Sequence, residues 1–225
     1  MRSSPVFLAA LVAQSVCGCY QGSSPNDQLA IGSETWICVT VGATTSPISK
    51  SFKYTRFSFK ATVDEFAVLE LENSFSDEYY PDDALMQKLW APETPPSTSE
   101  LWVHVESEGQ FSYQKVFRKE AATWPTAVAV ISVLEGKVTG ISWDFGCFSC
   151  SSETCAPNTY RYSGEAVSGA GDECFVEDVD CKPGASHAPK DCDLKVYATW
   201  SGTDSKGSYL LSQQKRLSNF KQSVA

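Results

Sequence analysis

Apolar and polar residues alternate over many short segments of this chain, a pattern typical of β-strands that bury one face. Within residues 101–106 the apolar positions are Leu101, Val103 and Val105, and the intervening positions are Trp102, His104 and Glu106. We expect the first three side chains to be buried and the other three to face solvent, with His104 an ordinary surface histidine. Strands are predicted at residues 36–41, 52–63, 66–71, 101–105, 111–117, 127–134, 138–145 and 194–200.

Three positions in this pattern carry further information. Residues 127–134 are apolar on both faces apart from Ser132, which is typical of a central strand covered on both sides. Gly136 follows that segment, and its tolerance of positive φ predicts a hairpin turn. The alternation within residues 52–63 changes phase near Thr55 and Arg56, which predicts a β-bulge there.

Only one segment has the pattern of a helix. Pro81 suits a first helical turn, Asp82 and Asp83 favour the positive end of the helix dipole, and Pro92 would end the helix. Many short strands with one short helix predict a mainly β fold, an antiparallel β-sandwich. Residues 147–192 are rich in Gly, Ser, Asp and Pro, and we expect them to form a disulfide-rich loop excursion from the sandwich.

The N-terminus is organised like a secretory signal peptide. Arg2 precedes an apolar run at residues 6–16 that is too short to span a bilayer, and no later run is long enough for a transmembrane helix. We expect cleavage before Cys19. The chain would then divide into a signal peptide, a flexible leader, a single β-sandwich domain and a basic tail, at residues 1–18, 19–33, 34–203 and 204–225. The alternative is a bacterial lipobox, in which an acylated Cys19 anchors the chain to a membrane.

The cysteines indicate an oxidising compartment. The eight that remain after cleavage can all pair, and they are Cys19, Cys38, Cys147, Cys150, Cys155, Cys174, Cys181 and Cys192. Because the segment 147–192 has few apolar residues, disulfides would replace a hydrophobic core there. We expect its six cysteines to pair among themselves and Cys38 to pair with Cys19, with the connectivity of the six left open. The Cys147-x-x-Cys150 spacing also occurs in redox and zinc sites, but the cysteine spacings around it favour disulfides.

The formal net charge of −9 is concentrated in the same segment. An acidic body argues against nucleic acid as a ligand, because binding phosphate requires a basic surface. One acidic cluster is expected to be a solvated loop, and it comprises Asp172, Glu173, Glu177, Asp178 and Asp180. A second run combines acids with tyrosines and is a candidate site for a cation or a glycan, comprising Asp77, Glu78, Tyr79, Tyr80, Asp82 and Asp83. Its alternative role is a solvated loop that caps the following helix.

The sequence offers little for catalysis. There are two histidines, neither in the pattern of a catalytic base, and the common motifs of serine hydrolases, zinc proteases and phosphate-binding loops do not occur. We therefore predict no catalytic residue, no metal site and no cofactor. The expected function is a secreted or cell-surface, non-enzymatic protein that binds extracellular proteins or glycans. The alternatives are a lectin-like module that binds glycans or cations, and a secreted glycoside hydrolase, which needs only two suitably spaced carboxylates.

Overall fold

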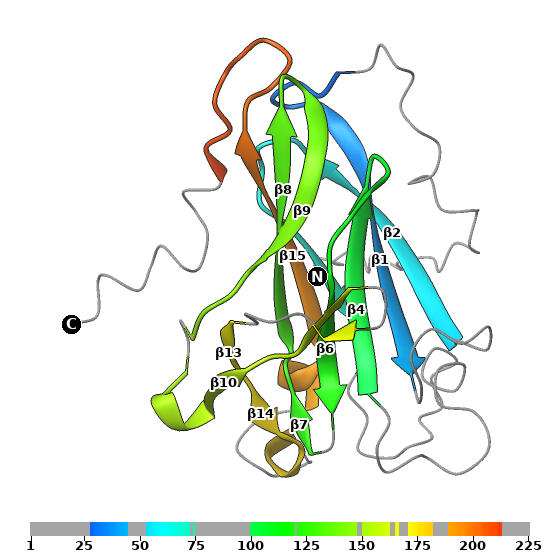
Figure 1. Ribbon diagram of the computed structural model, residues 1–225, viewed down its shortest axis with the longest axis vertical. Coiled ribbons are helices and arrows are strands. Elements are labelled where there is room, and N and C mark those ends of the chain that lie inside the picture. Colours follow the sequence, from blue (N-terminus) through cyan, green and yellow to red (C-terminus); the bar gives the residue numbers. More distant parts are fainter. Residues whose placement is uncertain are drawn as a thin grey trace, which may run out of the picture.

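The computed structural model describes residues 28–44, 53–72, 74, 100–119, 121–147, 150–162, 165–166, 171–181 and 189–212. The mainly β fold predicted from the alternation is confirmed, with antiparallel strands that curl around a common core and a disulfide-rich loop region (Figure 1). The predicted helix after Pro81 lies outside the described residues. Among the residues that the structure does describe, no helix has the length and apolar character needed to cross a membrane.

The larger sheet is antiparallel throughout and follows the order β12-β11-β6-β4-β1-β2. Its main strands are β1 (Glu34–Thr44), β2 (Lys53–Thr62), β4 (Glu100–Ser107), β6 (Gln114–Lys119), β11 (Tyr160–Tyr162) and β12 (Glu165–Ala166). Three two-residue strands extend it: β5 (Gln110–Phe111) pairs with β4, while β7 (Ala122–Thr123) pairs with β6 and with β14 (Val176–Glu177). Strands of the segment 147–192 therefore belong to the sheet.

The second sheet has the order β3-β15-β8-β9. Its strands are β3 (Ala67–Leu71), β8 (Thr126–Leu134), β9 (Lys137–Asp144) and β15 (Leu194–Gly202). The pairing of β15 with β8 is parallel, which the sequence analysis did not anticipate. Because β9 runs antiparallel to β8, it ends where β8 and β15 begin, so the whole segment between β9 and β15 connects at one end of this sheet.

The remaining elements are short and lie within the segment between β9 and β15. Strand β10 (Cys155–Pro157) pairs with β13 (Asp172–Cys174) as a two-stranded sheet. Three 3₁₀ helices accompany them: η2 (Ser152–Thr154), η3 (Asp178–Cys181) and η4 (Pro189–Cys192). In Figure 1 these elements lie below the second sheet, close to the ends of β6 and β7.

The core lies between the two sheets. One face of β1, β4, β8 and β15 supplies its centre, through Ile37, Val39, Val41, Leu101, Val103, Val105, Ala127, Ala129, Ile131, Val196, Ala198 and Trp200. Each fully buried Val, Leu or Ile side chain contributes roughly 1.5–3 kcal/mol relative to an exposed position. The predicted buried face of β4 is confirmed. So is the central place of β8, which lies inside its sheet with most residues buried.

The opposite face of β4 is not the solvated face that the alternation predicted. Trp102 is 2% exposed and Glu106 is 0% exposed. Trp102 packs with Val116 and Trp124, and Phe175 of the segment between β9 and β15 packs against the same cluster. The prediction failed because a part of the chain that is distant in sequence packs on this face. Such a contact cannot be predicted from the local pattern of apolar and polar residues.

The β-bulge predicted at Thr55 and Arg56 is also wrong. Strand β2 pairs with β1 in unbroken register through both residues. Arg56 occupies a position from which its guanidinium reaches Glu106 on β4 at 2.8 Å. The change in apolar phase therefore occurs without an extra residue in the strand.

Turn residues fix the β8–β9 connection. Glu135 and Gly136 have φ values of 50° and 78°, as a tight hairpin with two positive-φ residues requires, so the predicted hairpin is confirmed.

At the end of β15, Gly202 has a φ of 101°, and a Cβ added there would lie 1.8 Å from the carbonyl oxygen of Val133. Replacing Gly202 by Ala should lower the free energy of unfolding by about 2 to 3 kcal/mol, because backbone atoms cannot move aside as a side chain can. Gly207→Ala is the matched control, since Gly207 also has positive φ but has no atom within 4 Å of the added Cβ. The control should lose only about 1 kcal/mol. Urea unfolding measures both, and equal losses would contradict the steric argument.

Candidate functional site

Three disulfides brace the segment between β9 and β15, which we call the disulfide segment (residues 147–192). They join Cys147 to Cys155, Cys150 to Cys174, and Cys181 to Cys192. The first two hold β10 and β13 against the start of the segment, and the third ties η3 to η4. Cys38 is also disulfide-bonded, but Cys19, its predicted partner, lies outside the described residues.

The sulfur atoms of Cys147, Cys150 and Cys174 lie within 4.8 Å of one another. Zinc sites use thiolate ligands at this kind of spacing. All three sulfurs are committed to disulfides here, so they are not available as thiolates. Cys147 and Cys150 thus belong to two neighbouring disulfides.

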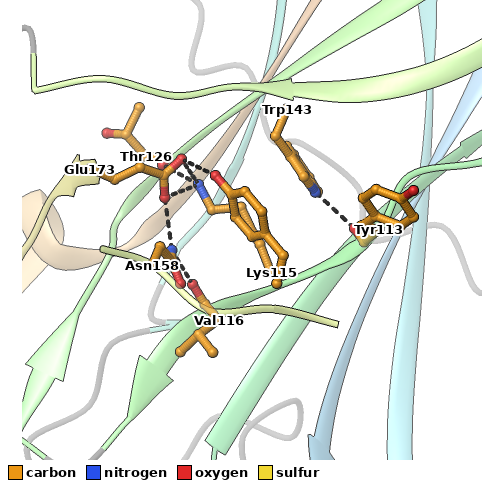
Figure 2. A network of polar contacts seen from close by, with 8 residues as sticks. Tyr113, Lys115, Val116, Thr126, Trp143, Asn158 and Glu173 are labelled. Atoms are coloured by element: carbon orange, nitrogen blue, oxygen red, sulfur yellow. Dashed lines mark hydrogen bonds and ion pairs between the residues drawn. The ribbon is translucent and has the colours of Figure 1, made fainter. Parts of the chain in front are cut away.

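Among the described residues, a buried group of polar side chains lies where the disulfide segment meets β6. Lys115 is 0% exposed, and its Nζ lies 2.7 Å from both carboxylate oxygens of Glu173 on β13. Nζ also donates a hydrogen bond of 3.2 Å to the carbonyl oxygen of Thr126 at the start of β8. In Figure 2 dashed lines join this ammonium group to Glu173 on β13 and to Thr126 on β8. We call Lys115, Asn158, Tyr160 and Glu173 the buried polar centre.

Asn158 and Tyr160 complete the contacts of the Glu173 carboxylate. The Asn158 amide nitrogen donates to Glu173 Oε2 at 2.7 Å and to the carbonyl oxygen of Val116 at 2.9 Å (Figure 2). The Tyr160 hydroxyl donates to Glu173 Oε1 at 3.1 Å. The amide oxygen of Asn158 is buried and has no hydrogen-bond partner among the described residues. Glu173 thus accepts hydrogen bonds from three side chains.

The surroundings of the buried polar centre disfavour charged side chains. Burial lowers the pKa of Lys115, while the charge of Glu173 and the hydrogen bond to it act in the opposite direction. Burial raises the pKa of Tyr160, and the negative charge of Glu173 adds to this effect, so the hydroxyl remains a donor. The Trp143 ring centroid lies 5.4 Å from Lys115 Nζ, and the indole N–H is held by the carbonyl oxygen of Tyr113 at 2.7 Å.

A second ion pair holds the disulfide segment to the same part of the sheet. Arg118 on β6 donates from Nε and Nη2 to Oδ2 of Asp178, at 3.0 and 2.6 Å. The Thr123 hydroxyl donates to Oδ1 of Asp178 at 2.8 Å. Both ion pairs join a base on β6 to an acid of the disulfide segment.

These contacts correct the interpretation of the acidic cluster as a solvated loop for two of its five residues, while Asp172 and Glu177 are exposed as predicted. Glu173 is 5% exposed and Asp178 is half-buried, because each has a cationic partner on β6. The sequence analysis missed Lys115 and Arg118 altogether. One signal for Lys115 was present: it alternates with Tyr113 and Phe117 on the apolar face of the predicted strand 111–117. A lysine in that register requires a buried anion.

A separate polar group lies on the outer face of β1, β2 and β4. Arg56 donates to Thr40 at 3.2 Å and to Glu106 Oε2 at 2.8 Å, and Glu106 Oε1 is buried without a hydrogen-bond partner among the described residues. Burial raises the pKa of Glu106, against the effect of Arg56. Burial, helped by the positive charge of Arg56, lowers the pKa of His104 from 6.5 to about 4. His104 is thus not the ordinary surface histidine predicted from the sequence.

This shift predicts an acid sensitivity. Folded His104 stays neutral down to pH about 4, whereas the unfolded residue takes up its proton near pH 6.5. The unfolded state therefore binds more protons between these values, and the free energy of unfolding should fall by about 3 kcal/mol as the pH drops from 6.5 to 4. The His104→Gln variant should lose this contribution. Both proteins keep Glu106 and Arg56, so the difference between their urea unfolding curves isolates His104, and parallel pH profiles would contradict the assignment.

The remaining predicted binding residues fall outside the described part of the chain. These are the acidic and tyrosine residues Asp77, Glu78, Tyr79, Tyr80, Asp82 and Asp83. The functional groups that the structure brings together are instead those of the buried polar centre. All four of these side chains are buried.

Comparison with known protein families gives a match. Residues 110–224 match the protein-family model described as "Uncharacterised protein DDB_G0273449". The matched region includes the disulfide segment and all four residues of the buried polar centre. Neither the curated proteins nor the solved structures contain a significant match to this chain.

Proposed function

We propose that this chain, which belongs to the family described as "Uncharacterised protein DDB_G0273449", is exported and works as a non-enzymatic structural or interaction protein. The observation that carries this proposal is the set of three disulfides in residues 147–192. Disulfides persist in oxidising compartments outside the cytosol and are rare where thiols are kept reduced. The signal-like N-terminus supports the same location.

The way in which the disulfide segment is held supports a role in binding. Two ion pairs, Lys115 with Glu173 and Arg118 with Asp178, fix a segment with little apolar core onto a β-sandwich. Such a segment keeps one conformation in the extracellular medium and can present a constant surface to a protein or a glycan. Pre-organisation of this kind favours binding, because less conformational entropy is lost on contact.

A non-enzymatic role is supported by the burial of the reactive groups. Lys115 and Glu173 lie inside the protein, away from any external molecule. The lowered pKa of His104 keeps its imidazole neutral at neutral pH, and its neighbours Arg56 and Glu106 are already engaged with each other. A glycoside hydrolase would need two carboxylates facing one open cleft.

The test of export is the state of the protein recovered from its native source. We expect the protein in the extracellular fraction, with residues 1–18 removed and with no cysteine that reacts with an alkylating agent before reduction. Mass spectrometry of the N-terminal peptide also distinguishes cleavage before Cys19 from acylation at Cys19. Recovery from the cytosol with the leader attached and the thiols free would overturn the proposal.

The test of a glycan partner is a glycan array with the mature protein. Binding that is lost in both Tyr79→Ala and Tyr80→Ala would assign glycan recognition to these two tyrosines. With no binding on the array, a protein partner remains, and cross-linking in the extracellular fraction identifies it. Turnover of a polysaccharide by the pure protein would contradict the non-enzymatic assignment.

A further inference from the structure

We propose that Lys115 and Asn158 become joined by an amide cross-link, formed within the folded protein with Glu173 as the proton carrier. A buried amine, a buried carboxamide and one carboxylate meet in this centre, from β6, the residue after β10, and β13. Lys115 Nζ and Asn158 Nδ2 each lie 2.7 Å from the same oxygen, Oε2 of Glu173. Figure 2 shows the lysine and asparagine side chains converging on that carboxylate.

The nucleophile of this reaction is the neutral amine. Nζ lies within hydrogen-bond distance of both carboxylate oxygens, so its proton can pass directly to Glu173. The transfer replaces two buried charges by two neutral groups, which a dry environment favours because isolated charges are costly there. The lowered pKa of Lys115 agrees with this direction of transfer.

The bond changes balance without an oxidant or any other reagent. Nζ of Lys115 forms a bond to Cγ of Asn158, and the protonated Glu173 gives its proton to Nδ2, which lies at hydrogen-bond distance. The bond between Cγ and Nδ2 breaks and ammonia leaves. The excess proton on Nζ returns to Glu173. The products are one secondary amide between the two side chains, one ammonia and a neutral Glu173 carboxyl group.

The environment favours this reaction over hydrolysis. Lys115, Asn158 and Glu173 are all buried, which keeps bulk water away from the lysine amine and the asparagine amide. The Tyr160 hydroxyl and the Val116 carbonyl oxygen fix the carboxylate and the amide through further hydrogen bonds. In the product, the neutral Glu173 adds a hydrogen-bond donor to a site where Asn158 Oδ1 has no partner among the described residues.

The cross-link would complete the attachment of the disulfide segment. The three disulfides join parts of the segment to one another, and none of them reaches β6. A bond between Lys115 and Asn158 would link the segment covalently to a central part of the larger sheet. Unlike the disulfides, it would survive reduction.

The experiment is mass spectrometry of the folded, full-length protein after complete reduction of its disulfides. We expect a mass lower than that of the sequence by one ammonia, and a branched tryptic peptide that contains Lys115 and Asn158. Trypsin should not cut after Lys115. A wild-type protein with its full mass and with normal cleavage after Lys115 overturns the proposal, whatever the variants show.

Variants assign the roles. Asn158→Ala and Lys115→Met should each show their full mass, and Glu173→Gln should show it too, because glutamine preserves the shape but carries no proton between the nitrogens. Glu177→Gln is the matched control, since it removes an exposed acid from the same segment and should leave the branched peptide unchanged. A branched peptide of the same mass in Glu173→Gln would contradict the role of Glu173.

Discussion

Replacing Glu173 by glutamine should lower the free energy of unfolding by about 3 to 5 kcal/mol. Glutamine keeps the size of the side chain and an oxygen that can accept from Tyr160 and Asn158. What it removes is the negative charge that Glu173 places beside the fully buried Lys115 before any cross-link forms, and because the variant cannot form the cross-link, its Lys115 stays an ammonium group without a counter-charge. The cost of removing an ammonium group from water is not offset when the group has no counter-charge inside the protein. The expected loss of free energy of unfolding is therefore large.

Urea unfolding measures this loss, and two comparisons make it specific. The Glu177→Gln variant removes an exposed carboxylate of the neighbouring strand β14 and should change stability by less than about 0.5 kcal/mol. Adding Lys115→Met to Glu173→Gln should restore the electrostatic part of the loss, because the unpaired charge is then absent. If the double variant is no more stable than Glu173→Gln, the buried charge is not the cause.

The strands of this protein were predictable because the alternation of apolar and polar residues within a strand indicates which of its faces is buried. The apolar faces of residues 101–105 and 127–134 lie in the core as expected, and Gly136 makes the expected turn. The parallel pairing of β15 with β8 was not predictable, since it depends on where the chain returns after the disulfide segment. The packing of Phe175 against the cluster that contains Trp102 escaped prediction for the same reason.

The buried polar centre shows more clearly what the sequence pattern cannot predict. Lys115 and Glu173 are 58 residues apart in sequence, and each is ordinary in its own neighbourhood: a lysine in a strand and an acid in an acidic loop. Only the fold makes them a pair. The apolar register of Lys115 was an unused signal that this lysine needs a buried partner, but the identity of that partner depends on where the fold places β13 relative to β6. The pattern of residues along the chain therefore does not tell which charged side chains meet in the folded protein.

The disulfide between Cys150 and Cys174 should matter most among the three, because Cys174 directly follows Glu173. Replacing both cysteines by serine should lower the free energy of unfolding by about 3 kcal/mol through the larger freedom of the unfolded chain. The same change should also loosen the hold of Glu173 on Lys115, so that the disulfide segment opens before the sandwich does.

The disulfide between Cys181 and Cys192 provides the matched control. It closes a sequence separation of 11 residues against 24 for Cys150 and Cys174, so its removal should cost about 0.5 to 1 kcal/mol less. Limited proteolysis followed by mass mapping shows where each variant opens. We expect early cuts at residues 150–174 in the Cys150→Ser/Cys174→Ser variant, while β1, β4 and β8 stay protected. Early cuts in those strands, or a larger loss in the Cys181→Ser/Cys192→Ser control, would mean that the disulfides do not act mainly on the segment that contains them.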